Sequence, residues 1–141
     1  MGISKASAQW DGGLKTGKGN MKPAHAPEIP FSLGTRFEGQ PGSNPEEMIG
    51  AALAGCFSMA LSVGLETAGQ KPQSIRTTAE VRLDKDGPGF SITSIELTTQ
   101  ASVPGLDAGR FQTIAEETKK NCPVSKALAG TKIVLKASLA T

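Results

Sequence analysis

Two cysteines are the residues of this sequence with the widest range of chemistry. Cys56 lies inside the apolar stretch GAALAGCFSMAL, residues 50–61, and Cys122 begins the segment CPVS. Free cysteine often packs as a small hydrophobic side chain, so packing is one interpretation of both residues. The ionised thiol is instead a nucleophile that a peroxide oxidises to a sulfenic acid. Packing and redox catalysis therefore both remain open as roles of the two cysteines.

An arginine and a glutamate carry the charges that a reactive thiol needs. Burial raises the pKa of a helical cysteine unless a cation is near, and Cys56 lies beyond the reach of its own helix dipole. Arg36, in TRFEG, is a candidate cation whose forked donors suit peroxide oxygens. Glu46, in NPEE, can hold that guanidinium by a bidentate contact. The plain alternatives are a solvated arginine and a glutamate that only favours the helix dipole.

The spacing between Glu46 and Cys56 limits how both can serve one site. They are ten residues apart, which is about 15 Å along one helix. Either the long Arg36 side chain spans part of this gap, or Glu46 comes from the helix of a second copy. Cys122 lies at the start of a short predicted helix, a position that favours the thiolate, and we expect it to form a disulfide with oxidised Cys56.

The elements that position these residues follow from the sequence pattern. The turn DGG, residues 11–13, separates predicted strands at 3–10 and 14–21, and the proline-rich segment 22–43 allows a short strand around 35–37. Asn44 is a predicted N-cap for a helix from Pro45 to about Ala68. Glu47 can bond back to the N–H of that cap.

The second half of the chain predicts a hairpin, two helices and a last strand. Strands are expected at 75–84 and 90–103 around the turn DKDGPG, and alternation places Ile75 and Val81 on one face. Asp107 is expected to cap a helix to about Lys120, Pro123 to start a short helix, and 131–139 to form a strand. Strands and helices are segregated, which predicts the α+β class with antiparallel sheets.

The long central helix is the most unusual predicted element. Residues 48–65 carry no charge, which requires burial on all sides. A membrane span is disfavoured because the stretch is short, rich in small residues and flanked by acids. A chain of 141 residues has little material to cover such a helix, so we expect two copies to pack together in a homodimer.

Composition excludes several classes of protein. A net charge of +2 and a scarcity of aromatic residues argue against a nucleic-acid partner. Two cysteines and one histidine are too few for a disulfide scaffold or a four-ligand zinc site. The N-terminal stretch shows no secretory signal, so a cytoplasmic location is expected.

The motifs together resemble the OsmC/Ohr family, the osmotically inducible and organic hydroperoxide resistance proteins. The resemblance covers nearly the whole chain, and TRFEG makes it more similar to the osmotically inducible branch. It rests on W-x-G at Trp10, K-x-G-K-G at Lys15, TRFEG, NPEEMIGAALAGCFSMALS, VRLDKDGPGFSIT, VPGLD and NCPVSKAL.

This resemblance implies a fold and an activity. The fold is a single domain, residues 1–141, in an intertwined homodimer whose antiparallel sheets wrap two long central helices. The activity is a thiol-dependent peroxidase for oxidative and hyperosmotic stress, with a preference for organic hydroperoxides. Cys56 would be the peroxidatic thiol and Cys122 the resolving thiol, with Arg36 and Glu46 as the polar pair. A lipoyl-type dithiol would be the external reductant, and no metal, haem or flavin is implied.

Two other functions compete with the peroxidase. In a structural or binding dimeric stress protein the cysteines would only pack, and Cys56 would be unreactive with a raised pKa. In a redox sensor, oxidation of Cys56 would change shape without turnover. The sensor needs a partner surface or DNA-binding element, and the sequence has no basic stripe or recognition helix.

Overall fold

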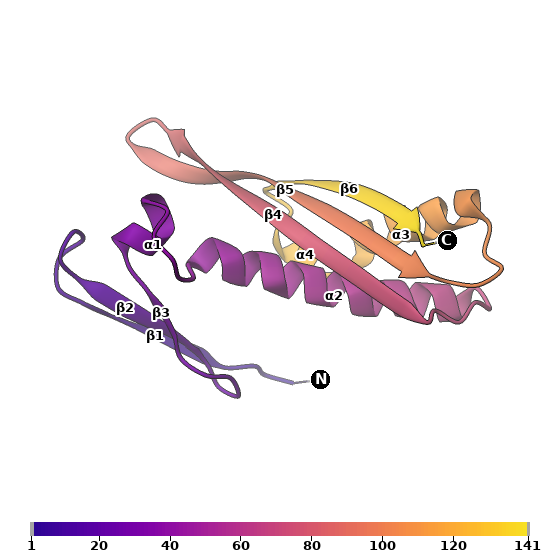
Figure 1. Ribbon diagram of the computed structural model, residues 1–141, viewed down its shortest axis with the longest axis horizontal. Coiled ribbons are helices and arrows are strands. Elements are labelled where there is room, and N and C mark those ends of the chain that lie inside the picture. The colour runs from indigo at the N-terminus through magenta and orange to yellow at the C-terminus, as the bar shows by residue number, and fades with distance from the viewer. Residues whose placement is uncertain (1, 141) are drawn as a thin grey trace. The chain divides into compact units, whose positions relative to one another are not determined.

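The computed structural model describes residues 2–140, which belong to two compact units, Met1–Met48 and Ile49–Thr141. Each unit contains one three-stranded sheet together with helical segments (Figure 1). This confirms the α+β class. The single domain expected over residues 1–141 stays a prediction.

The N-terminal unit is built on an antiparallel sheet. β1 (Ala6–Asp11), β2 (Lys18–Pro23) and β3 (Ile29–Phe31) pair in that order. The first two strands were predicted, and both begin three or four residues later than the sequence pattern indicated. Gly12 makes the turn after β1 with a φ of 92°, a conformation that glycine adopts without a steric penalty.

An aromatic pair closes one side of this sheet. The rings of Trp10 and Phe31 have centroids 5.4 Å apart and pack at a tilt. Gly19 lies between them, and a Cβ atom there would come within 2.8 Å of both rings. A side chain at position 19 would therefore displace the pair.

The segment around Arg36 is helical, so the predicted strand at 35–37 is wrong. α1 (Leu33–Phe37) begins at a capping box, in which the Ser32 N–H donates to Thr35 Oγ1 at 2.9 Å and the Thr35 N–H donates to Ser32 Oγ at 3.3 Å. These two local bonds satisfy the first donors of the helix. The short strand of this region is β3, just before the cap.

The long helix α2 (Pro45–Thr67) starts as predicted. The Glu47 N–H donates to Asn44 Oδ1 at 2.8 Å, which confirms Asn44 as the cap. The Glu47 carboxylate accepts a hydrogen bond from the Ser43 hydroxyl at 2.8 Å. The helix ends one residue before the predicted Ala68, and Gly69 has a φ of 81°.

The C-terminal unit has a mixed sheet rather than an antiparallel one. β4 (Ser74–Asp86) and β5 (Gly89–Ser102) form the predicted antiparallel hairpin. α3 (Ala108–Asn121) and α4 (Pro123–Ala127) follow, and β6 (Lys132–Leu139) then pairs parallel to β5. The two helices form a crossover connection, which returns the chain to the same end of the sheet and makes a parallel pair.

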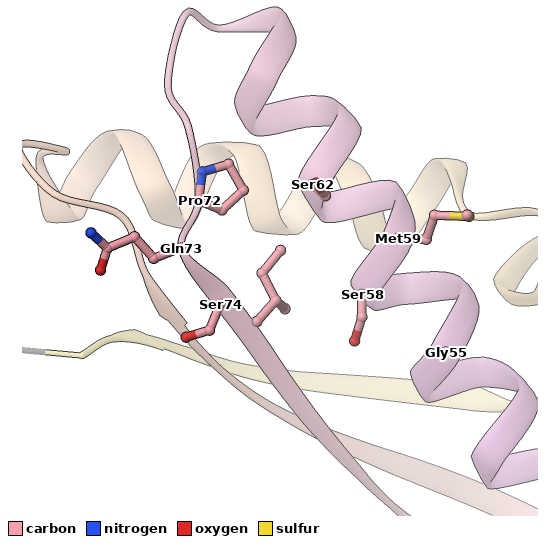
Figure 2. Close-up of a pocket in the computed structure, with 8 residues that line it drawn as sticks. Gly55, Ser58, Met59, Ser62, Pro72, Gln73 and Ser74 are labelled. Atoms are coloured by element: carbon pink, nitrogen blue, oxygen red, sulfur yellow. The ribbon is translucent and has the colours of Figure 1, made fainter.

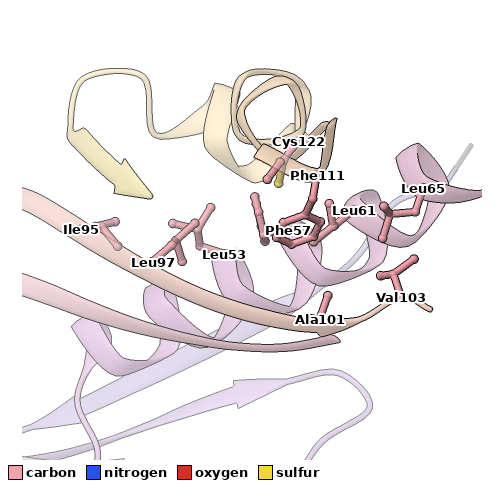
Figure 3. Packing of buried hydrophobic residues seen from close by; sticks show 11 residues of the cluster. Leu53, Phe57, Leu61, Leu65, Ile95, Leu97, Ala101, Val103, Phe111 and Cys122 are labelled. Atoms are coloured by element: carbon pink, nitrogen blue, oxygen red, sulfur yellow. The ribbon is translucent and has the colours of Figure 1, made fainter. Parts of the chain in front are cut away.

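One stripe of α2 forms the centre of the core. Leu53, Phe57, Leu61 and Leu65 recur every fourth residue and are fully buried (Figure 3). Around them pack Val103, just after β5, and residues of β5 and α3, among them Ile95, Leu97, Ala101, Phe111 and Ala115. Phe57, the neighbour of Cys56 in the sequence, is therefore a core residue.

Hydroxyl groups fix α2 on the sheet beside this stripe. The Ser58 hydroxyl donates to Thr77 Oγ1 at 2.8 Å, and Thr77 Oγ1 lies 2.9 Å from Thr99 Oγ1 on the next strand. This series of hydrogen bonds ends at the backbone oxygen of Arg76, which accepts from Thr99 Oγ1. Since hydrogen bonds are directional, this series sets the rotation of α2 about its axis.

The opposite face of α2 is exposed in the single chain, and its cover by a second copy stays a prediction. Its small and apolar residues include Ala51, Gly55, Met59 and Val63, with Met59 75% and Val63 60% exposed. By length and composition alone α2 is a helix that could cross a membrane, and 28% of its most apolar window is buried. The absence of a membrane span stays a prediction.

Candidate active site

The two cysteines meet within the C-terminal unit. Cys56 comes from the middle of α2 and Cys122 from the junction of α3 and α4, and their Sγ atoms are 2.8 Å apart. Both are free thiols, because a disulfide would require about 2.05 Å. Residues 66 positions apart in the sequence are thus close enough to form a bond after a small movement.

The backbone on both sides holds Cys122 in place. Its N–H donates to the Thr118 carbonyl at 2.9 Å and so ends α3, and its carbonyl accepts from the Lys126 N–H at 3.0 Å and so begins α4. Pro123 follows at the first position of α4, where it cannot continue α3. Cys122 is fully buried, and Cys56 is partly buried against the same core.

The two thiols differ in acidity. Burial raises the pKa of Cys56, and the hydrogen bond with Cys122 raises it further. Burial also acts to raise the pKa of Cys122, but the donors on Cys56, on Ser125 and at the Val124 N–H outweigh it, so the net pKa is lowered. When the pair has lost one of its two protons, the remaining proton therefore stays on Cys56. A Cys56 thiolate needs a cation from outside this unit.

The predicted charge pair forms within the N-terminal unit. Arg36, in the last turn of α1, donates from Nε to Glu46 Oε1 at 3.0 Å and from Nη2 to the same oxygen at 2.6 Å. Nε also lies 3.2 Å from Glu46 Oε2. The Glu46 side chain is 9% exposed and that of Arg36 is 36% exposed. The carboxylate thus fixes the guanidinium while leaving part of it accessible.

The four predicted site residues fall into two pairs. Arg36 with Glu46 and Cys56 with Cys122 are each in direct contact. Arg36 and Glu46 contact each other within one chain. That both pairs serve one site stays a prediction.

Hollows lie beside both pairs. Next to Arg36 is one of about 300 Å³, lined mainly by the apolar side chains of Trp10, Leu14, Phe31, Leu33 and Phe37. Another of about 520 Å³ lies between α2 and α3 and reaches Cys122. A third, of about 430 Å³, lies along α2 between Met59 and residues 72–75, and neither thiol lines it (Figure 2).

Two features of these surroundings were not predicted. Trp10, which lines the hollow beside Arg36, is far from it in the sequence, and no local pattern connects the two. Ser125 is buried close to Cys122. It stands three residues after the cysteine, the spacing that helix-capping rules relate to the N-cap, so the sequence could have indicated it. Within residues 2–140, no group of three or more His, Cys, Asp or Glu side chains is placed to hold a metal ion.

The close approach of the thiols predicts a disulfide within one chain. Diamide, which oxidises thiol pairs without a peroxide, should convert the protein to a form about 2 Da lighter that no longer reacts with a thiol reagent. Peptide mapping should find Cys56 joined to Cys122. Cys122→Ser is the control and should not form this bond. Two free thiols after complete reaction with diamide would contradict the geometry.

Comparisons with known proteins identify the family. The family model for OsmC-like protein matches residues 37–137, beginning one residue after Arg36. "Peroxiredoxin OsmC" of Escherichia coli (strain K12) is 50% identical over 126 residues, 88% of each chain. "Organic hydroperoxide resistance protein" of Xanthomonas axonopodis pv. citri (strain 306) is 31% identical over 93 residues, 65% of this chain and 63% of that one.

A solved structure shows the same fold. The crystal structure of an organic hydroperoxide resistance protein from Elizabethkingia anophelis aligns over 99% of this chain and 98% of that one, with a TM-score of 0.73 at 24% identity. The family match covers most of the chain, and it agrees with the 50% identical relative and with the family that the motifs resemble. The chain belongs to the OsmC family.

Proposed function

We propose that this protein is a thiol-dependent peroxidase that reduces organic hydroperoxides to alcohols. The observation that carries the proposal is the contact between two free thiols, Cys56 and Cys122, at 2.8 Å. The family supports it, because relatives are named peroxiredoxin and organic hydroperoxide resistance protein. Fold alone does not establish activity, so the proposal depends on the residues of the site.

The reaction proceeds in three steps. The Cys56 thiolate attacks the distal oxygen of the hydroperoxide, the O–O bond breaks, and the organic fragment takes a proton and leaves as an alcohol. Cys56 is then a sulfenic acid, and Cys122 attacks its sulfur to form the disulfide with release of water. An external dithiol, of lipoyl type by family resemblance, supplies the two electrons that restore both thiols by exchange.

Arg36 and Glu46 have the task of making the first step possible. The raised pKa of Cys56 means that a neighbouring positive charge must stabilise its thiolate, and we assign this role to Arg36. Its forked donors also align the peroxide oxygens. Glu46 holds the guanidinium in position, and the apolar hollow beside Arg36 suits the organic part of the substrate.

We further propose a homodimer in which the exposed face of α2 packs against a second copy. Small residues at positions 51 and 55 allow close approach, and the exposed apolar side chains of Met59 and Val63 would be removed from water. A cytoplasmic location, a role in oxidative and hyperosmotic stress, and sites at the subunit interface remain parts of this proposal.

One observation favours a second function without turnover. The raised pKa of Cys56 is the property expected of a thiol that only packs or that reacts slowly as a sensor. The measurements below separate this structural or sensing protein from the peroxidase.

Single-turnover chemistry tests the proposed activity. With one equivalent of tert-butyl hydroperoxide, the wild-type protein should lose both thiols rapidly and become about 2 Da lighter. Cys56→Ser should abolish peroxide consumption. Cys122→Ser should consume one equivalent and then stop with Cys56 oxidised. Both thiols still titratable in wild-type protein after long exposure would assign the cysteines to packing.

The pH dependence tests the role of Arg36. Arg36→Met should move the rise of the peroxide reaction rate to higher pH, because a raised Cys56 pKa leaves less thiolate at neutral pH. If the midpoint moves up by about one pH unit, the rate below it falls about tenfold. Arg36→Lys keeps the charge without the fork and should recover part of this loss. An unchanged profile in Arg36→Met would remove Arg36 from this role.

The oligomeric state tests the exposed face of α2. Sedimentation of the wild-type protein should give the mass of two chains, and Val63→Glu should reduce it to one, because two charges would be buried together. Val63→Thr, of nearly the same shape, is the matched control and should remain dimeric. A monomeric wild-type protein with a native circular dichroism spectrum would exclude the dimer.

A further inference from the structure

Ser125 has a buried hydroxyl group without a hydrogen-bond partner. The residue is 7% exposed, and among the described residues its Oγ is the buried side-chain oxygen or nitrogen atom that no group satisfies. A hydroxyl that is removed from water and left unpaired destabilises the folded protein. Native proteins tolerate such groups where function uses them, which raises the question of what state of the protein satisfies Ser125.

The position of Ser125 in α4 points to the sulfur of Cys122. Cys122 is the N-cap of α4, and Ser125 is the third residue of the helix. In a capping box the side chain of the N-cap accepts the N–H of this third residue, and the side chain of the third residue accepts the backbone N–H of the cap. The Cys122 side chain makes no such bond here. The Cys122 N–H is already bonded to the Thr118 carbonyl, so the Ser125 hydroxyl can act only as a donor toward the Cys122 sulfur, and a neutral thiol is a weak acceptor.

Ionisation of Cys122 would turn its sulfur into a strong acceptor for the Ser125 hydroxyl. A thiolate carries a full negative charge and accepts hydrogen bonds more strongly than a thiol. Although burial opposes ionisation of Cys122, the donors on Cys56 and Ser125 act to lower its pKa. The charged side chains near either end of this junction, Lys119, Lys120 and Lys126, are not among the groups that shift the pKa of Cys122.

We propose that the Ser125 hydroxyl is a specific donor to the Cys122 thiolate, held unpaired in the reduced protein and satisfied when Cys122 ionises. For turnover this rests on the proposed peroxidase. The Cys122 thiolate attacks the sulfur of the Cys56 sulfenic acid, the S–S bond forms and the S–O bond breaks. Hydroxide leaves and takes a proton to become water.

The same donor acts when the disulfide is reduced. The thiolate of an external dithiol attacks the sulfur of Cys56, and the electron pair of the S–S bond passes to Cys122, which leaves as a thiolate. A better stabilised leaving thiolate departs faster. Ser125 therefore serves both steps that pass through an ionised Cys122, and it acts on the attack on the peroxide only through the proton that the two thiols share.

A thiolate titration tests this role without turnover. In a Cys56→Ser background Cys122 is the one thiol, and its ionisation is followed by absorbance near 240 nm. Adding Ser125→Ala should move the midpoint to higher pH by about one pH unit, a tenfold loss of thiolate below it. Adding Ser125→Thr, which keeps the hydroxyl, should retain the parent midpoint. Equal midpoints for the parent and Ser125→Ala would overturn the proposal.

Unfolding separates this role from a structural one. Since the hydroxyl is unpaired in the reduced protein, Ser125→Ala should leave the urea midpoint at pH 6 unchanged or higher. A lower midpoint without a change in the titration would show a structural serine and overturn the proposal.

Stopped-flow kinetics on the full chain then place Ser125 in the reaction. With tert-butyl hydroperoxide, Ser125→Ala should form the Cys56 sulfenic acid at the wild-type rate and close the disulfide about tenfold more slowly. Loss of rate in the first step alone would overturn the assignment. If the wild-type protein failed to react with the peroxide, the peroxidase would fall while the titration still decided the role of Ser125.

Discussion

The contact between Cys56 and Cys122 is the constraint on which the chemistry of this chain depends. Two sulfurs at 2.8 Å require that α2 and the junction of α3 and α4 be fixed to within a small distance. The leucine and phenylalanine stripe of α2 fixes its depth in the core, and the hydroxyl chain from Ser58 fixes its rotation. Backbone bonds on both sides of Cys122 fix the other sulfur. A small core thus supplies the precision that disulfide exchange requires.

Electrostatics divides the work between the two thiols. The pair shares one environment, yet burial raises the pKa of Cys56 while local donors lower that of Cys122. The C-terminal unit by itself therefore prepares Cys122 as the nucleophile and leaves Cys56 dependent on an outside charge. Arg36, fixed by Glu46, has the required properties. In this proposal the first oxidation depends on the guanidinium, and the later steps depend on the donors around Cys122.

The helix α2 joins these functions to assembly. Its buried stripe belongs to the core of one chain, whereas its opposite face exposes small and apolar residues that include Met59 and Val63. An apolar helix that its own chain covers on one side only is unusual for a monomer. The arrangement explains why α2 has the composition of a membrane span and yet contributes four large residues to a protein core. The dimer proposed here would bury the second face.

Much of this protein follows from the sequence alone, because local patterns encode it. Caps at Asn44 and Asp107, the hairpin turn and the proline after Cys122 predicted most of the elements, and the two cysteines with Arg36 and Glu46 were recognisable candidates. One local signal was missed: the capping box of Ser32 and Thr35 makes a helix where a short strand was expected. The parallel pairing of β6 and the unpaired hydroxyl of Ser125 were decided by the tertiary structure. Both depend on which distant segments come together and exclude water, and no local pattern carries that information.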